Sequence, residues 1–174
     1  MPPITDQISL NTRLASIVID QAVMIFLCSM AVAPAAFLVE GLSPFLSEAY
    51  DYPALLAPTM YLCKDTVNGR SIGKRLLNLQ IVNEGDRQVA SPARCVVRNV
   101  TLLISPIELL IAMLNPSRRL GDRLAGTRLK FSNEPLRDSS RVGPVISVFF
   151  IVYALIILTA FLLKGWQKYL FMLN

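Results

Sequence analysis

Histidine is absent from the 174 residues of this chain, and cysteine is scarce. Without histidine there is no histidine-based catalytic triad, haem site or histidine-ligated zinc site, so proton chemistry falls to carboxylates, thiols or phenols. The three cysteines, Cys28, Cys63 and Cys95, lie in or beside apolar stretches. Their odd number and their position favour reduced thiols in helices over a disulfide framework, and their spacing is not that of metal ligands. The sequence predicts neither a metal nor a cofactor.

Charge is also scarce, because 17% of the residues are charged and 53% are hydrophobic. The mean hydropathy of +0.51 makes the chain more apolar than an ordinary soluble domain. Residues 145–163 carry no charge, and residues 14–39 carry only Asp20. Runs of this length predict membrane spans. The roughly 90 residues outside the spans are fewer than a separate soluble domain usually has, so we expect one membrane-embedded domain.

Four apolar runs are visible, at residues 14–37, 53–63, 99–114 and 145–163. The first has an alternative interpretation as a signal peptide, because small residues at 31–33 resemble a cleavage site. It is, however, too long for one and contains Asp20. The third is short for a span, is interrupted at Ser105 and Pro106, and contains Glu108. Upstream of it, Ser91 and Pro92 form an N-cap and N1 pair that predicts a helix start.

The distribution of lysine and arginine predicts the topology. Residues 64–98 and 115–144 each carry seven of these side chains, whereas residues 40–52 carry none. Such residues stay on the cytoplasmic side of a membrane. If residues 99–114 crossed the bilayer, one of the two basic loops would lie outside. We therefore predict that residues 99–114 are re-entrant or interfacial, that three helices cross, and that the N-terminus and both basic loops are cytoplasmic.

Two short alternating patterns predict strands. Leu77, Leu79 and Ile81 alternate with polar residues ahead of a turn at residues 84–86, and a second alternation runs from Thr127 to Phe131. An isolated strand is not stable, so these two would pair, which requires both basic loops on one side. The predicted fold is an all-α membrane protein of three crossing helices and a re-entrant or interfacial segment, with a small cytoplasmic β-hairpin-like element.

Asp20 is the most informative charged residue. A carboxylate near the centre of a membrane helix costs about 2.5 to 3.5 kcal/mol of insertion, and such a residue usually has a partner or a function. Arg13 lies seven residues earlier, about 10 Å along the helix and on the same face. Two interpretations stay open at this point: Asp20 either binds and transfers ions, with Gln21 nearby as an oxygen ligand, or it only fixes helix packing.

The remaining charged segments predict simpler roles. The spacing of glycines in residues 69–75 is not that of a phosphate-binding loop, so a contact with lipid headgroups is the better interpretation. From its local spacing alone, Asp122 is predicted to be a solvent-exposed charge in a loop. The net charge of +5 comes with no recognition motif for nucleic acid, and no enzyme motif is present. The predicted headgroup contacts are Lys74, Arg75, Arg118 and Arg119.

The ordered set of motifs resembles the RDD family of small bacterial-type membrane proteins, named for one arginine and two aspartates. Arg13 opens an apolar helix that contains Asp20, glycines at 69 and 73 precede a strand, Arg98 with Asn99 enters a later helix, and residues 120–127 read LGDRLAGT. The matching positions of the family triad are Arg13, Asp20 and Asp122. Many members have histidine where this chain has Gly121, so this chain lacks the imidazole that a proton relay would use.

The resemblance covers about residues 11–131. It leaves an N-terminal tail at 1–10, a basic linker at 132–144, and an additional C-terminal membrane helix with a short tail at 145–174. It implies a bacterial inner membrane protein and suggests transport of unidentified ligands, with sodium/proton exchange for some members. Other members look like accessory subunits of membrane complexes.

The resemblance also leads to a hypothesis about the site. We expect Arg13 to pair with Asp122 in a structural polar network that includes Arg98, leaving Asp20 and Gln21 as the deeper ion-binding and proton-coupling group. The first functional hypothesis is a monovalent cation/proton exchanger, homo-oligomeric because three helices do not easily enclose a pathway. The alternative is a scaffold or assembly factor within a larger membrane complex.

Overall fold

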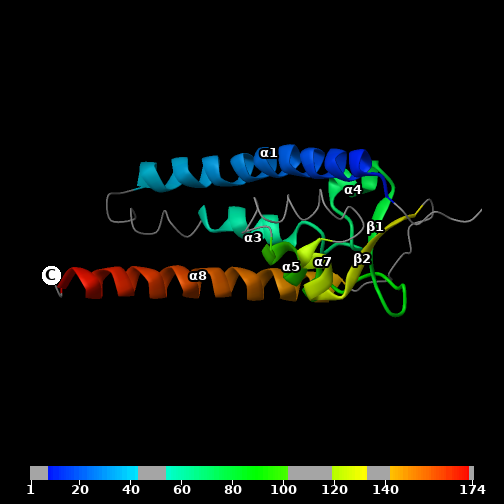
Figure 1. Ribbon diagram of the computed structural model, residues 1–174. Coiled ribbons are helices and arrows are strands. Elements are labelled where there is room, and N and C mark those ends of the chain that lie inside the picture. Colours follow the sequence, from blue (N-terminus) through cyan, green and yellow to red (C-terminus); the bar gives the residue numbers. More distant parts are fainter. Residues whose placement is uncertain (1–7, 43–53, 102–118, 133–141, 173–174) are drawn as a thin grey trace, which may run out of the picture.

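The structure is a computed structural model that describes residues 8–42, 54–101, 119–132 and 142–172. Two long helices, α1 (Leu10–Leu42) and α8 (Val142–Met172), extend in the same direction from a group of short elements at one end, here called the polar cap (Figure 1). The cap consists of α4 (Ile72–Leu76), β1 (Leu79–Asn83), α5 (Pro92–Val100), α7 (Leu120–Ala125) and β2 (Thr127–Phe131).

Two helices in the described part of the chain are long and apolar enough to cross a membrane. They are Leu10–Pro34, with 25 residues, and Val142–Gln167, with 26 residues. Large apolar side chains along both, such as Phe26 and Phe161, are exposed, as bilayer-facing residues are. These helices correspond to the predicted first and last spans.

The two middle runs of the prediction look different. In run 53–63 the described helix is α3 (Leu56–Cys63), whose eight residues extend only about 12 Å. That is too short to cross a bilayer alone. The predicted re-entrant segment falls mostly on residues 102–118, so its conformation, the interruption at Ser105 and Pro106, Glu108 and Arg118 lie outside the described residues.

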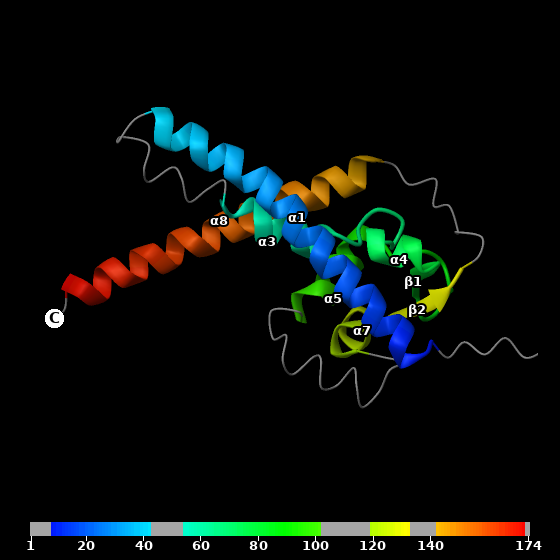
Figure 2. The ribbon, with the colours of Figure 1, turned by 90° about the horizontal axis from the view of Figure 1, so that it is seen from above.

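The short helix α3 packs between the two long helices. Leu62 and Cys63 of α3 pack against Val152 of α8 in one apolar cluster, to which Val148 and Phe149 of α8 also contribute. On the other side, α3 contacts α1. Seen from above, α1 and α8 cross close to α3 (Figure 2). Because α3 lies between them, α1 and α8 do not pack along their whole length.

The two basic loops meet in an antiparallel sheet, as the alternating patterns predicted. β1 pairs with β2 in a register that puts Ile81 opposite Leu129. Ile81 and Leu129 share a core with Leu79 and Cys95. The first strand begins at Leu79 rather than at the predicted Leu77, because Leu77 caps α4 and the next residue has a positive φ of 53°.

Local sequence signals explain the two helices beside the sheet. Ser91 caps α5 by accepting a hydrogen bond from the Arg94 amide at 3.5 Å, with Pro92 in the first turn, as predicted. In α7, a Cβ on Gly121 would lie 2.1 Å from the Arg98 carbonyl oxygen. Only glycine allows α7 to lie this close to α5. The close approach brings Asp122 to the face of Arg98.

Candidate functional site

Asp20 of α1 is held by the start of α4. The Ser71 hydroxyl donates to Asp20 Oδ2 at 2.6 Å, and the Gly73 amide donates to Oδ1 at 2.8 Å. The Lys74 ammonium adds a third bond, to Oδ2, at 3.0 Å. Ser71 also caps α4, so the unpaired amides of that helix start face the carboxylate. Both Asp20 oxygens are therefore engaged, and its charge is balanced by Lys74.

Lys74 bridges two carboxylates. Its ammonium donates to Asp65 Oδ1 at 2.7 Å as well as to Asp20, and Lys74 is only 3% exposed. Asp65 follows α3 and also accepts from Arg98 Nη1 at 3.4 Å. Burial alone would raise the pKa of Asp65, but the positive charges of Lys74 and Arg98 hold it well below its usual range. Asp65 is therefore a buried carboxylate that stays ionised.

Asp122 of α7 completes the cluster. Arg98 Nε donates to its Oδ1, Arg13 Nη2 donates to its Oδ2 at 2.8 Å, and the Arg119 amide donates to Oδ2 at 3.1 Å. Burial opposes the charged form, yet Arg98, Arg13 and Arg119 together lower the pKa of Asp122 to about 2. The expected pairing of Arg13 with Asp122 is present in the structure, and Arg98 joins it.

These contacts form one continuous buried network, here called the ionic ring. Carboxylates and cations alternate, three of each, and α1 supplies both ends, so the helix closes the ring. Each member is at most 3% exposed. Removing one member would leave an uncompensated buried charge, which is strongly destabilising. The ring joins α1 to four segments of the cap region, in the order Arg13, Asp122, Arg98, Asp65, Lys74 and Asp20.

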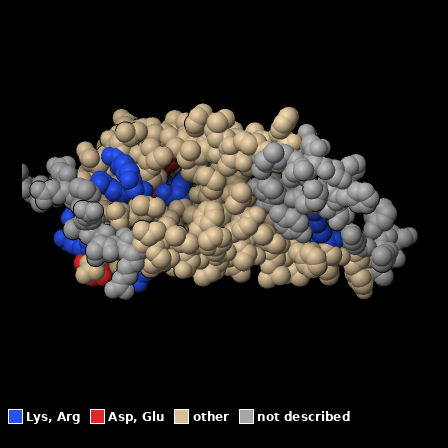
Figure 3. Space-filling model, turned by 180° about the vertical axis from the view of Figure 1, so that it is seen from behind, with Lys and Arg blue, Asp and Glu red and all other residues tan. Residues whose placement is uncertain are grey.

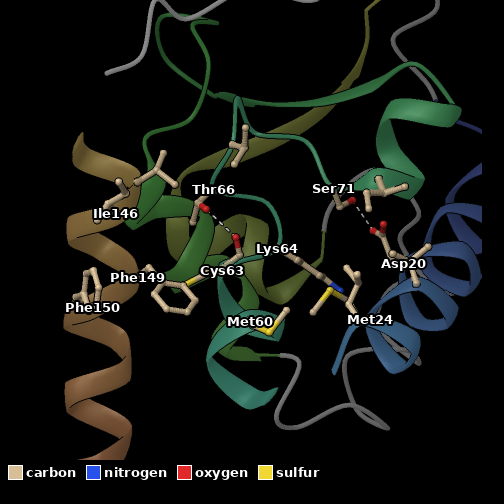
Figure 4. Close-up of a pocket in the computed structure, with 15 residues that line it drawn as sticks. Asp20, Met24, Met60, Cys63, Lys64, Thr66, Ser71, Ile146, Phe149 and Phe150 are labelled. Carbon is tan, nitrogen blue, oxygen red and sulfur yellow. Dashed lines mark hydrogen bonds between the residues drawn. The ribbon is translucent and has the colours of Figure 1, made fainter. Parts of the chain in front are cut away.

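A cavity of about 490 Å³ adjoins the ring between α1, α3 and α8. Asp20 lies at its lining, together with the polar residues Lys64, Thr66 and Ser71, while Met24, Phe149 and Phe150 are among its apolar residues (Figure 4). The volume falls within the roughly 300 to 1,000 Å³ typical of small-molecule sites. The arrangement places one carboxylate of the ring beside space between the two candidate spans.

The structure corrects several expectations about individual residues. Gln21 is exposed and accepts a hydrogen bond from the Tyr61 hydroxyl at 3.0 Å, so it points away from the bonds that hold Asp20. Lys74 is not a headgroup contact, because its ammonium is buried between two carboxylates. Arg119 is 8% exposed and its amide binds Asp122, which also removes it from the surface. Arg75 is exposed, so for Arg75 the headgroup contact stays a prediction.

Asp65 is the member of the ring that sequence reasoning missed. It lies two residues after the apolar run at 53–63, directly beside Lys64, where a short-range ion pair or a loop charge is the ordinary interpretation. Its position just beyond an apolar run was the available signal. Its partner Arg98 lies 33 residues away in the sequence, so no local pattern reveals the contact.

Comparison with known families decides the identity. The sequence model of the RDD family matches residues 9–169. The chain belongs to the RDD family. The match extends past the expected residue 131 and includes most of α8, so the last candidate span is part of the RDD region. Comparisons with curated proteins and with solved structures found no significant match.

Within this RDD protein, the triad residues have distinct surroundings. Arg13 and Asp122 are bonded to each other, whereas Asp20 binds α4. Arg98, Lys74 and Asp65 link the two parts. The arginine and the two aspartates are thus members of one network, although only two of them are in direct contact.

Proposed function

We propose that this RDD protein is a membrane transporter, not an enzyme, that exchanges a monovalent cation for a proton at the pair formed by Asp20 and Lys74. The observation that carries the proposal is the position of Asp20. Its carboxylate lines the cavity between the two candidate spans and is bonded at 3.0 Å to a buried ammonium. A cation that reaches the cavity therefore meets a carboxylate whose counter-charge is a group able to release a proton.

The proposed exchange uses Lys74 as the proton carrier. Three donors engage both oxygens of Asp20, and Lys74 is the charged one among them, so we assign the exchanged proton to Lys74. In the proposed step, a cation bound at Asp20 displaces the Lys74 ammonium from that carboxylate, and Lys74 releases its proton while Asp65 remains beside it. Reprotonation of Lys74 restores the pair and expels the cation. One cation is then exchanged for one proton.

The assembly around this pair is part of the proposal. Two or three helices enclose no pathway by themselves, which favours a homo-oligomer in the bacterial inner membrane. The pairing of β1 with β2, and the contact of α5 with α7, support a re-entrant or interfacial segment 99–114. The elements that precede the segment and those that follow it meet in the cap. We propose that the cap is cytoplasmic.

The test is cation-dependent proton movement in proteoliposomes under an imposed pH gradient. We expect movement with the unchanged protein and none with Asp20→Asn or with Lys74→Arg. Arginine keeps the positive charge but is not deprotonated in proteins, so Lys74→Arg removes the exchangeable proton alone. Asp86→Asn is the matched control, because Asp86 is an exposed carboxylate in a turn of the cap. Absence of movement for sodium, potassium and lithium would refute the proposal.

A second candidate function is supported by the closure of the ionic ring. Every carboxylate in it has at least two partners, as a static scaffold or assembly factor requires. A scaffold needs these bonds but no titration. A folded Lys74→Arg protein that still supports its membrane complex would favour this second candidate.

A further inference from the structure

Lys64 differs from the other cations around the cavity. It follows α3 and lines the cavity, and in the described part of the chain no carboxylate lies within 4.0 Å of its ammonium. Among the described residues, the carboxylates that act on Lys64 are those of Asp65 and Asp20, and both are already paired with Lys74 or Arg98. The Lys64 ammonium lies over the Tyr61 ring, 4.2 Å from its centroid. Among the described residues that line the cavity, Lys64 is therefore a positive charge without a paired carboxylate.

The surroundings make this charge costly. Burial among apolar side chains lowers the pKa of Lys64 from 10.5 to about 8. Its charged neighbours do not reverse the shift, because Asp65 and Asp20 favour the charged form while Lys74 and Arg119 oppose it. An anion beside the ammonium would stabilise the charged form, as for other partly desolvated cations.

The rest of the cavity is lined by apolar residues. From Asp20 it follows α1 through Val23 and Met24 to Leu27, about 10 Å along the helix, and α8 faces it with Phe149 and other apolar side chains (Figure 4). The polar lining residues lie at the cap end. A charged end followed by an apolar groove is complementary to an amphiphile with an anionic head.

The position of the cavity points to a lipid of the bilayer. Arg13, Ser16 and Asp20 on one face of α1 are buried, and the uncharged stretch of α8 begins at Val145. Lys64 lines the same cavity as Asp20 and Val145, so it lies where both helices leave the cap. In Figure 3, a small group of basic and acidic atoms lies recessed between further basic atoms at the cap end and the uncharged surface of the long helices. The boundary between a polar cap and apolar helices is where lipid phosphates lie.

We propose that this cavity binds one acyl chain of an anionic phospholipid, whose phosphate pairs with Lys64. The second chain remains in the bilayer beside α1 and α8. Binding is selective for anionic over zwitterionic lipids, because a net negative headgroup supplies the charge that the cavity lacks. The test of this site requires the cavity and Lys64 only and does not depend on cation exchange at Asp20, although Asp20 lines the same cavity and a bound lipid would compete there with an exchanged cation.

The test places a fluorescent reporter in the cavity. The chain has a single tryptophan, Trp166, which Trp166→Phe removes. Phe149→Trp then reports on the cavity, and Phe161→Trp, on an exposed part of α8 outside the cavity lining, reports on the surrounding bilayer. Lipids with brominated chains quench tryptophan on contact. The full-length protein is measured in vesicles of phosphatidylcholine with increasing amounts of phosphatidylglycerol, with bromine on one lipid at a time.

We expect phosphatidylglycerol to occupy the site at position 149 about fivefold more strongly than phosphatidylcholine, the ratio that one basic residue near a membrane surface provides. At position 161 the two lipids should be equivalent. Lys64→Gln should remove the preference at position 149, and Lys64→Arg should keep it. Arg94→Gln, an exposed charge elsewhere in the cap, should leave it unchanged.

Three results would overturn the proposal. The first is equal quenching by both lipids at position 149 with Lys64 present. The second is a preference that survives Lys64→Gln. The third is no quenching by either lipid at position 149, which would indicate that a second copy or another polypeptide fills the cavity. If Lys64→Gln does not fold, the lipid preference at position 149 compared with position 161, measured with Lys64 present, still tests whether the cavity selects the anionic lipid.

Discussion

Arg98 is the residue on which the ionic ring depends most, because it binds the two carboxylates that have the least contact with water. Asp65 and Asp122 are both 0% exposed. Arg98→Gln would leave these two negative charges facing each other in the cap. We expect a loss of about 3 to 5 kcal/mol of folding free energy, the usual cost of breaking a buried ion pair. Thermal unfolding in detergent and accumulation in the membrane are the measurements.

Arg94→Gln is the control for this prediction. Arg94 belongs to the same helix, α5, but is exposed and has no partner in the ring. Surface substitutions of this kind usually change stability by less than about 0.5 kcal/mol. If Arg98→Gln unfolded at the same temperature as Arg94→Gln, the ring would not be a source of stability.

Acidification should lower the folding stability of the protein, because Asp122 becomes protonated. The folded pKa of about 2 lies below the ordinary value of 3.8, so the folded state binds the proton more weakly than the unfolded state. The resulting stabilisation, on the order of 2 kcal/mol, is complete above the ordinary pKa and is lost as the pH falls toward 2. We expect the unfolding temperature to decline between about pH 4 and pH 2. In Asp122→Asn, the decline over the same window should be shallower; an unchanged slope would contradict the assignment.

Single residues also mark the limit of what the sequence could reveal. Asp20 stood out because a charge in an apolar helix is costly, and that argument is local. Asp122 was recognised as a site residue only through the family resemblance, because its ion-pair partner Arg13 lies 109 residues away in the sequence. Lys74 looked like a surface anchor for the same reason, since its carboxylate partner Asp20 is 54 residues distant. Local patterns identify costly residues but not the partners that balance them.

At the scale of elements, the contact of α4 with α1 depends on a missing side chain. A Cβ on Gly73 would lie 2.6 Å from Asp20 Oδ1 and 2.9 Å from the Ser16 carbonyl oxygen, so Gly73→Ala would force α4 away from α1. Overpacking of this kind costs about 1 to 3 kcal/mol. We expect lower thermal stability and weaker activity in the proposed cation/proton exchange, because the bonds from Gly73 and Lys74 to Asp20 would lengthen together.

The matched variant is Gly85→Ala. Gly85 lies in the turn after β1, and a Cβ there would meet nothing within 4 Å. Its unfolding temperature should therefore equal that of the unchanged protein. If Gly73→Ala were equally stable and fully active, the close approach of α4 to α1 would have no functional importance.

The elements themselves were predictable to different degrees. The strands followed from alternation, and α5 from its Ser91 and Pro92 start, because both signals lie within a few residues. The helices α4 and α7 have only five and six residues, and no amphipathic period develops over so short a segment. They are stabilised by contacts with α1 and α5 that sequence reasoning could not supply.

At the scale of the whole molecule, the paired strands constrain the path of the chain through a membrane. β1 precedes the run at 99–114 and β2 follows it, yet Asn83 and Thr127 are partners in the sheet. If α1 and α8 both span, each leaves the same cap and ends on the opposite side of the bilayer. The cap and the far end of α8 should therefore differ in accessibility.

Single cysteines test this arrangement in a variant that lacks Cys28, Cys63 and Cys95. Gly85→Cys in the turn after β1 and Ser132→Cys after β2 should react with a membrane-impermeant reagent only when it is given access to the cytoplasmic side. Gln167→Cys, exposed at the end of the α8 span, should react only from the opposite side. Labelling of Gly85→Cys and Ser132→Cys from different sides would require residues 99–114 to cross the bilayer, which is incompatible with the β1 and β2 pair. Labelling of all three from one side would instead show that α8 lies on the membrane without crossing it.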